Sequence, residues 1–161
     1  MMALCSELLA SLNGRTFSSA ESCTGGGIGA AFTAVPGSSA AYKGGIISYT
    51  NWVKENVLGV PGSVLTEFGA VSEETAKAMA VGVRKMMRST MAISVTGIAG
   101  PGSDERNTPV GTVYIGFANT ERVYARSFLF DGDRDSVRLQ AIRAALEILI
   151  GECKEDNLVN E

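Results

Sequence analysis

Hydrophobic and polar positions follow two different periods along this chain, and together they predict helices alternating with strands. Near the N-terminus, Leu4, Leu8 and Leu12 recur at helical spacing, and Asn13 with Gly14 marks the expected end of that helix. Compact apolar runs predict strands at residues 16–20, 44–49, 91–95, 110–118 and 122–130. The last two strands are joined by residues 119–121 only, which predicts a hairpin.

Helices are expected between and after these strands, at residues 24–35, 51–58, 72–88 and 133–150. We expect residues 61–69 to form a connecting loop, and the polar tail after Gly151 to be frayed. Alternating strands and helices followed by a hairpin predict an α/β sandwich in one domain, residues 1–161. Its sheet should be mixed and mainly parallel, with at least one antiparallel strand.

Charge and composition narrow the range of partners. The chain of 161 residues has 14 basic and 17 acidic side chains, a net charge of −3 and no basic run, which disfavours nucleic acid. No apolar stretch approaches the roughly 20 residues that span a bilayer, so we expect no membrane partner. Three widely spaced cysteines suit reduced thiols, and residues 1–15 do not resemble a secretory signal. These features predict a cytoplasmic protein.

The chain contains no histidine. This excludes a Ser-His-Asp triad, a thiol activated by imidazole and every metal site that needs a histidine. The three cysteines are too dispersed for a thiolate cluster, so we expect neither a metal nor another cofactor. A hydrolytic reaction in this chain needs a base other than imidazole.

Three segments with candidate chemistry each follow a predicted strand, at residues 21–27, 49–54 and 96–102. Ligands of open α/β sheets bind beyond the carboxyl ends of the strands. If the three strands are parallel, the segments share one edge of the sheet. We therefore expect them to line one pocket.

The first segment runs from a strand through glycines into a helix, an arrangement that suits a bound phosphate or an oxyanion. Its candidate substrate-binding residues are Cys23, Thr24, Gly25 and Gly26. The alternative is a tight turn with a Ser or Thr helix cap. The loose dinucleotide pattern from Gly25 to Ala30 is set aside, because no acidic residue ends the second strand.

The second segment contains Tyr49, Asn51 and Lys54, with the last two on one face of a short helix. A lysine there is usually a surface charge, and a tyrosine at a strand end usually packs. Without histidine, however, Lys54 becomes a candidate base for a serine. Its pKa must then fall well below the usual value of about 10.4.

In the third segment, Thr96, Gly97 and Gly100 are candidate substrate-binding residues, because glycines let the backbone approach a ligand closely. A plain loop is an equal alternative. Residues 131–135, with Arg138 one turn later, supply either a capped helix start with ion pairs or a phosphate-binding arginine. We favour the capping role.

Taken together, the motifs resemble those of the CinA C-terminal-domain family, which includes stand-alone nicotinamide-nucleotide amidases. The matching segments are residues 20–26, 37–39, 45–49, 54, 58–60, 69–73, 96–101, 109–113 and 132–134. They cover nearly the whole chain in the same order, which is far more specific than any single motif.

This resemblance implies a three-layer α/β/α fold and hydrolysis of nicotinamide mononucleotide to nicotinate mononucleotide and ammonia. It also implies a catalytic set of Ser22, Tyr49 and Lys54. In the reaction that we expect, Lys54 accepts the proton of Ser22, Tyr49 relays or positions that proton, and backbone N–H groups near residues 23–25 hold the oxyanion. Cys23 is a rival nucleophile, ranked second because no histidine activates its thiol. The alternative function is a non-catalytic nucleotide-sensing or competence-associated interaction module. The expected partner is a small nucleotide, and a homo-oligomer is left open.

Overall fold

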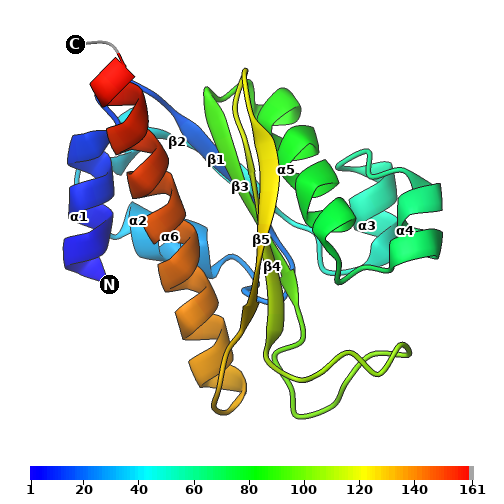
Figure 1. Ribbon diagram of the computed structural model, residues 1–161. Helices are drawn as coiled ribbons and strands as arrows, with labels where there is room; N and C mark the ends of the chain where they lie inside the picture. Colours follow the sequence, from blue (N-terminus) through cyan, green and yellow to red (C-terminus); the bar gives the residue numbers. More distant parts are fainter. Residues whose placement is uncertain (160–161) are drawn as a thin grey trace.

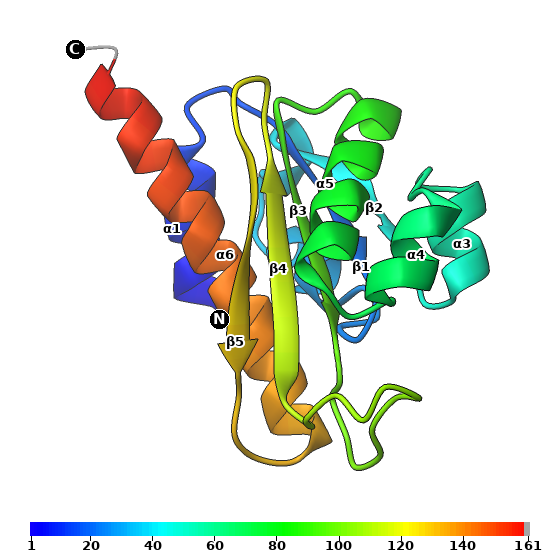
Figure 2. The same cartoon turned by 45° about the vertical axis from the view of Figure 1, so that its right-hand side comes forward.

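A five-stranded sheet forms the centre of the computed structural model, which describes residues 1–159, with side chains to Glu155 (Figures 1 and 2). The strand order is β2-β1-β3-β4-β5. The strands are β1 (Phe17–Glu21), β2 (Tyr42–Ile47), β3 (Met91–Gly97), β4 (Thr112–Ala118) and β5 (Val123–Leu129). All five predicted strands are therefore present, with ends shifted by a few residues.

The sheet is mixed, as predicted. β1 lies between β2 and β3 and pairs with both in parallel, with Ala20 opposite Ile46 on one side and Ser94 on the other. β4 runs antiparallel to both β3 and β5. Four strands thus point the same way and β4 alone is reversed, so the sheet is mainly parallel. The carboxyl ends of β1, β2 and β3 meet at one edge.

Helices cover both faces of the sheet and give the three layers that the family resemblance implied (Figure 1). One face carries α1 (Met2–Ser11), α2 (Gly27–Thr33) and α6 (Arg134–Val159). The other carries α5 (Glu73–Met87), with α3 (Asn51–Asn56) and α4 (Gly62–Phe68) beside it. A short 3-10 turn, Ser38–Ala40, precedes β2. No helix in the described part of the chain is long and apolar enough to cross a membrane.

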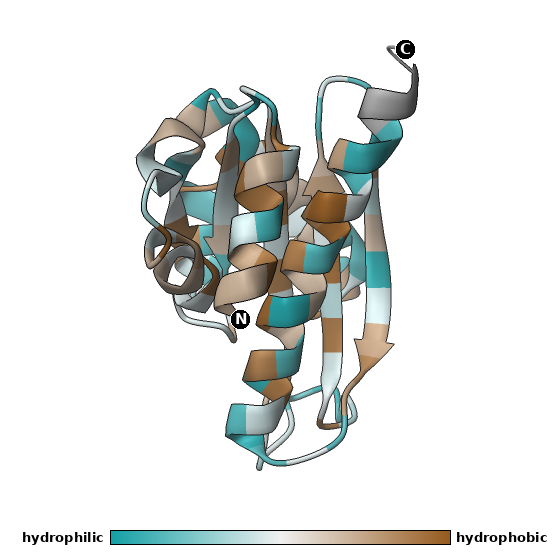
Figure 3. Cartoon of the chain, turned by 90° about the vertical axis from the view of Figure 1, so that its left-hand side faces the viewer, coloured by the Kyte–Doolittle hydropathy of each residue, from teal (hydrophilic) through white to brown (hydrophobic). Residues whose placement is uncertain are grey.

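Each face of the sheet has its own hydrophobic core, because side chains alternate across a strand. On β1, Phe17 packs with Phe32 and Tyr42 in the core under α1, α2 and α6. Ala20 belongs to the smaller core under α5, together with Met79 and Val83. Figure 3 looks onto α1 and α6, where polar and apolar residues alternate along the helices. The same alternation sends Ser22, just beyond β1, to the α5 side.

Two sequence-based expectations were wrong. Residues 61–69 are not a loop, because α4 occupies Gly62–Phe68 and buries Leu65. Pro61 stands at the helix start, where its fixed φ suits the first turn, and Gly69 ends the helix with a φ of 83°.

The tail after Gly151 is not frayed along its described length, because α6 continues to Val159. Glu152 is 4% exposed, accepts a hydrogen bond from the Tyr124 hydroxyl and pairs with Arg122, which ties the helix to β5. Residues 160 and 161, the end of the predicted tail, lie outside the described residues.

Candidate active site

Ser22 stands at the carboxyl edge of the sheet, directly after β1. Its amide donates to the carbonyl oxygen of Val95 on β3 at 2.9 Å, which extends the parallel ladder by one residue. The residue is only 9% exposed. The sheet therefore fixes the backbone of Ser22, and its hydroxyl lies among protein groups rather than in bulk water.

The side chain of Lys54 meets this hydroxyl. Thr50 caps α3 by accepting the Val53 amide, and Lys54 follows in the same short helix. Its Nζ donates to Ser22 Oγ at 3.1 Å and to the carbonyl oxygen of Ser48 at 2.7 Å. Lys54 is 2% exposed and has no acidic partner among residues 1–155, so neutral oxygens hold this buried ammonium.

Burial lowers the pKa of Lys54 to about 8, because an ammonium loses hydration when it leaves water. About a tenth of the molecules then carry a neutral amine at pH 7, against fewer than one in a thousand for a lysine of ordinary pKa. The Ser48 carbonyl occupies one N–H, which leaves the lone pair of a neutral Lys54 free to face Ser22. The geometry suits proton transfer from the serine to the lysine.

Glu21, immediately before Ser22, occupies the anion site expected at the start of α2. Its buried carboxylate accepts hydrogen bonds from the amides of Gly26, Ile28 and Gly29 at 3.0–3.1 Å. It also accepts the Thr24 hydroxyl at 2.7 Å. The protein's own carboxylate thus satisfies the helix N-terminus, and the expectation that Thr24 to Gly27 cradle a phosphate is wrong.

The amides around Thr24 differ in whether a ligand can reach them. The amide of Gly25 donates to the Ser22 carbonyl, and that of Gly27 to the Thr24 carbonyl. The Thr24 amide has no hydrogen-bond acceptor among residues 1–159. Thr24 is 0% exposed, however, whereas Cys23 lines a small pocket beside Ser22. The expected oxyanion donors near residues 23–25 therefore reduce to the N–H group of Cys23.

A small pocket of about 280 Å³ opens beside the serine and is lined by Ser22, Cys23, Tyr49, Gly97, Ala99 and Arg134. It brings together parts of all three segments that were expected to share the sheet edge. Tyr49 is 60% exposed, and its hydroxyl lies 3.4 Å from Nη2 of Arg134. In the part of the chain that the structure describes, this hydroxyl contacts neither Ser22 nor Lys54, so a proton relay through Tyr49 has no direct path here.

Two expected ligand-binding residues lie elsewhere. Thr96 is buried, and its hydroxyl donates to the Ala70 carbonyl at 2.6 Å, which holds the segment before α5. Asn51 is exposed and lines a separate hollow of about 690 Å³ between α3, α4 and the loop after β3. Gly100 contributes through its backbone, because its carbonyl accepts from Arg134 at 2.7 Å.

Arg134 was expected to belong to a capped helix start, and the structure also brings it to the lining of the serine pocket. The favoured capping role is correct for its neighbour, since Asp133 accepts the Ser136 amide at 2.9 Å. That cap starts α6 at Arg134, and the first turn then directs the guanidinium toward Tyr49 and Gly100. The sequence contained a signal for this contact. An arginine that directly follows a capping aspartate belongs to the first turn of the same helix.

Cys23 also lines the pocket, but its thiol is poorly suited to act as the nucleophile. Burial raises its pKa to about 11, so few molecules carry the thiolate near neutral pH. No group of three or more Cys, Asp or Glu side chains that could hold a metal ion occurs within residues 1–155, whose side chains the structure describes. The groups suited to chemistry at this edge are therefore Ser22, Lys54 and the polar atoms around them.

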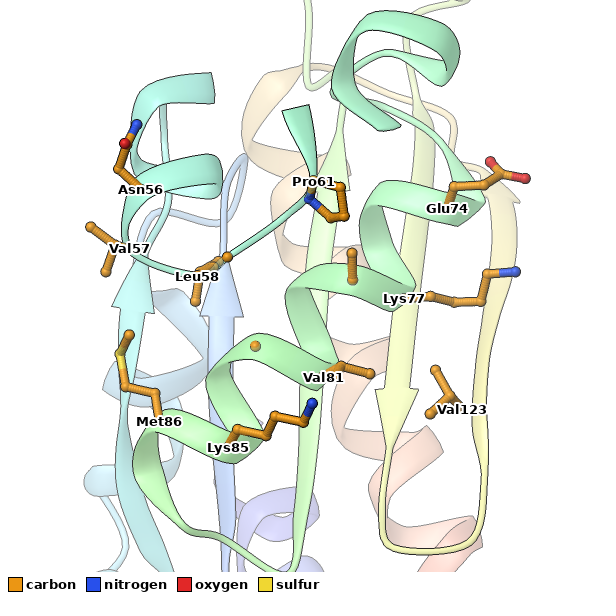
Figure 4. A pocket seen from close by; sticks show the side chains of 13 residues that line it. Asn56, Val57, Leu58, Pro61, Glu74, Lys77, Val81, Lys85, Met86 and Val123 are labelled. Carbon is orange, nitrogen blue, oxygen red and sulfur yellow. The ribbon is translucent and has the colours of Figure 1, made fainter. Parts of the chain in front are cut away.

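A larger hollow of about 870 Å³ lies on the other side of α3, between the α3–α4 connection, α5 and β5 (Figure 4). Its walls are mainly apolar, and the charged groups of Lys77, Lys85 and Glu74 stand around it. It contains neither Ser22 nor Lys54. Its size alone would make this hollow the candidate ligand site. The side chains suited to chemistry, however, lie at the smaller pocket.

The fold and the site together define an open, three-layer α/β protein with a serine and a buried lysine paired at the carboxyl edge of its parallel strands. A family model described as the CinA C-terminal domain matches residues 2–153. The chain belongs to this family.

Relatives and solved structures agree. A CinA-like protein of Endomicrobium trichonymphae is 48% identical over 137 residues, which are 85% of this chain and 32% of the relative. The chain thus spans about a third of the length of the curated relatives it matches. A CinA superfamily protein from Klebsiella pneumoniae superposes with a TM-score of 0.93 at 31% identity, covering 96% of this chain and 98% of the other. The competence/damage inducible protein CihA from Agrobacterium tumefaciens gives 0.89 at 40% identity, covering 93% of each chain.

Proposed function

We propose that this chain is an amidohydrolase that converts nicotinamide mononucleotide to nicotinate mononucleotide and ammonia, without a metal or other cofactor. The observation that carries the proposal is the 3.1 Å contact between Ser22 Oγ and the Nζ of a buried Lys54. A serine hydroxyl becomes an effective nucleophile when a nearby base removes its proton. Because the chain has no histidine, we assign the role of that base to Lys54.

In the first step, neutral Lys54 takes the proton of Ser22 as Oγ attacks the carboxamide carbon. The new C–O bond converts the carbonyl oxygen to an oxyanion, which we assign to the amide of Cys23, a residue that lines the pocket. The C–N bond then breaks, and the proton on Lys54 passes to the departing nitrogen, which leaves as ammonia. The product of this step is an acyl ester on Ser22.

In the second step, a water molecule attacks the ester and gives a proton to Lys54. The C–O bond to Ser22 breaks, Oγ recovers its proton from Lys54, and nicotinate mononucleotide leaves. Lys54 thus acts as base and then as acid in both halves of the reaction. Tyr49 stands at the pocket mouth, where its ring is placed to orient the substrate rather than to relay the proton.

The nucleotide phosphate is assigned to the guanidinium of Arg134, the cation among the residues that line the serine pocket. The neighbouring hollow with Asn51 is less suited to an anion, because Glu55, Asp104 and Glu105 line it. Its Arg106 donates to the carbonyls of Thr66 and Glu67. Charge therefore directs the phosphate to the Arg134 side.

The proposal includes a cytoplasmic location, which the buried, reduced thiols of Cys5 and Cys23 favour. A small nucleotide is the proposed partner, with no part assigned to nucleic acid or membrane. The longer relatives carry competence/damage-inducible names. The proposed reaction assigns this chain no part in competence or in a response to damage.

Release of ammonia from nicotinamide mononucleotide tests the proposal. The purified chain should produce ammonia and nicotinate mononucleotide in equal amounts, also in the presence of a chelator, and the Ser22→Ala variant should produce neither. Saturable binding of the nucleotide without ammonia release would overturn the proposal and favour the nucleotide-sensing alternative.

A further inference from the structure

The larger hollow, of about 870 Å³, has no role in the proposed reaction. The α5 residues that line it recur every three or four positions, so they form one stripe about three turns, or roughly 18 Å, long. This set, which we call the α5 stripe, consists of Glu74, Lys77, Ala78, Val81, Gly82, Lys85 and Met86. In Figure 2 the helix forms the outer layer on its face of the sheet, so the stripe borders solvent.

The two ends of the α5 stripe carry opposite charges that have no ion-pair partner. Glu74 lies in the first turn of the helix and Lys85 in the last, as Figure 4 shows. Among the side chains of residues 1–155, neither forms a salt bridge, whereas Lys77 is paired with Glu73 at 3.3 Å. Glu74 and Lys85 are about three turns apart and therefore lie on the same face of the helix.

Between these two charges the stripe is small and apolar. Ala78, Val81 and Gly82 occupy its centre. A second helix can approach such a surface closely, because short side chains let two helix axes come near each other. The midpoint between Ala78 and Val81 is also the midpoint between Glu74 and Lys85. The small residues and the two opposite charges are therefore arranged around one centre.

We propose that the α5 stripe is the contact surface of a homodimer, in which α5 of a second copy packs antiparallel to it around a two-fold axis through this centre. Such an axis places Glu74 of each copy opposite Lys85 of the other, so two ion pairs form together. The antiparallel arrangement also brings the helix dipoles into opposition, which is favourable. This inference concerns assembly and does not depend on the proposed reaction.

A second copy fits this charge pattern better than a partner of one charge. An acidic partner would face Glu74 with a like charge, and a basic partner would do the same at Lys85. Both ends are satisfied by a helix whose charges run in the reverse order, and an antiparallel α5 has that order. Met86 and Val123, which are 46% and 47% exposed, border the hollow and give the contact apolar surface to bury.

Exchange of the two charges tests the proposal, with light scattering after size exclusion as the measurement of mass. The wild type should have twice the mass of one chain. Glu74→Lys and Lys85→Glu should each weaken self-association by at least about tenfold, because each variant places two pairs of like charges in contact. An equimolar mixture of the two variants should form the dimer again, because the carboxylates of one chain then face the ammonium groups of the other.

The chain offers a matched control on the opposite face of the sheet. Arg143 and Glu147 of α6 form an ion pair at 3.6 Å, and both side chains are more than half exposed. Glu147→Lys and Arg143→Glu change the net charge as much as the two α5 variants do. They should leave the dimer as it is in the wild type, alone and mixed.

A change at the centre of the stripe gives a second, independent test. Val81→Arg places two arginines beside the two-fold axis and should give a monomer whose circular dichroism matches that of the wild type. A wild type that stays monomeric at every concentration would overturn the proposal and leave the hollow to a different partner. A dimer that survives both Glu74→Lys and Lys85→Glu would overturn it as well, because the contact would then lie on another surface.

Discussion

The two glycine-rich loops at the carboxyl edge of the sheet resemble each other in sequence but differ in what binds their backbone. In the loop after β1, the amides at the start of α2 donate to the carboxylate of Glu21. In the loop after β3, the Gly100 carbonyl accepts from Arg134, whose guanidinium also lines the pocket. Both loops accept hydrogen bonds from an arginine of α6, Arg138 at the first loop and Arg134 at the second. The first loop has an internal anion, and the second loop has the arginine that lines the serine pocket.

This difference separates two roles that a glycine-rich turn can have. The loop after β1 is closed to a phosphate, because a carboxylate already occupies its donors, and it is left to present Ser22. The loop after β3 lies beside the arginine that can attract the phosphate of a nucleotide. Nucleophile and anion recognition are therefore assigned to different loops.

The largest effect is expected in the loop after β1 and at its lysine partner. Ser22→Ala and Lys54→Met should each lower kcat/KM for nicotinamide mononucleotide by about a thousandfold or more, because either change leaves no activated nucleophile. The double variant should be little worse than either single one. Lys43→Met removes an exposed lysine and serves as the control. Near-normal turnover in Ser22→Ala would bring Cys23 forward.

Removal of the cation beside the second loop should have the next largest effect. Arg134→Ala should lower kcat/KM for nicotinamide mononucleotide by up to about 100-fold, since a charge-assisted hydrogen bond contributes roughly 1.5–3 kcal/mol. Activity on nicotinamide riboside, which lacks the phosphate, should change far less. Competition kinetics with the two substrates give the ratio directly. An equal loss on both would remove Arg134 from phosphate recognition.

Loss of the negative charge of Glu21 should lower the free energy of unfolding. Glu21→Gln replaces one acceptor oxygen by a donor group, so some of the buried N–H and O–H groups around it lose their partner. Urea denaturation should show an unfolding free energy lower by about 2 kcal/mol. Glu147→Gln, at an exposed ion pair, should cost no more than roughly 0.5 kcal/mol. Equal stability of the two variants would mean that Glu21 is not needed to hold the turn.

The value of kcat/KM should change about tenfold with pH. In the proposed reaction Lys54 acts as a base when neutral, and its pKa is about 8, so kcat/KM should rise about tenfold from pH 7 to pH 9 and then level off. A rate profile across this range, with separate stability controls, gives the midpoint. A flat profile, or one that rises only above pH 10, would remove Lys54 from the role of base.

Much of the fold was predictable because hydrophobic periodicity reports burial directly. The five strands and the helices around them were located from that pattern, and all but α4 were expected. Short α4 was missed because Pro61, Gly62 and Gly69 suggest a loop, whereas Leu65 alone marks its buried side. The end of α6 was placed too early because Gly151 resembles a helix stop, and the buried ion pair of Glu152 is not visible in sequence.

The candidate site was predictable where the chemistry allows only a few residue types. The absence of histidine favoured Lys54, and strand order placed its segment near Ser22. The contacts of Glu21 could not be predicted, because a glycine-rich turn binds an external or an internal anion with the same sequence. Thr96 and Asn51 were assigned to the pocket from proximity along the chain, but side-chain direction decides such contacts, and both face elsewhere.

The burial of Lys54 also connects the chemistry to folding. In the unfolded chain this side chain keeps its proton up to its ordinary pKa of 10.5, whereas the folded protein releases the proton at about pH 8. Between these values the unfolded state binds more protons, so the unfolding free energy rises with pH, by up to about 3 kcal/mol from this group. Folding at pH 9 therefore expels a proton into the buffer, and calorimetry in buffers of different ionisation enthalpy measures it. Lys54→Met should abolish that proton release.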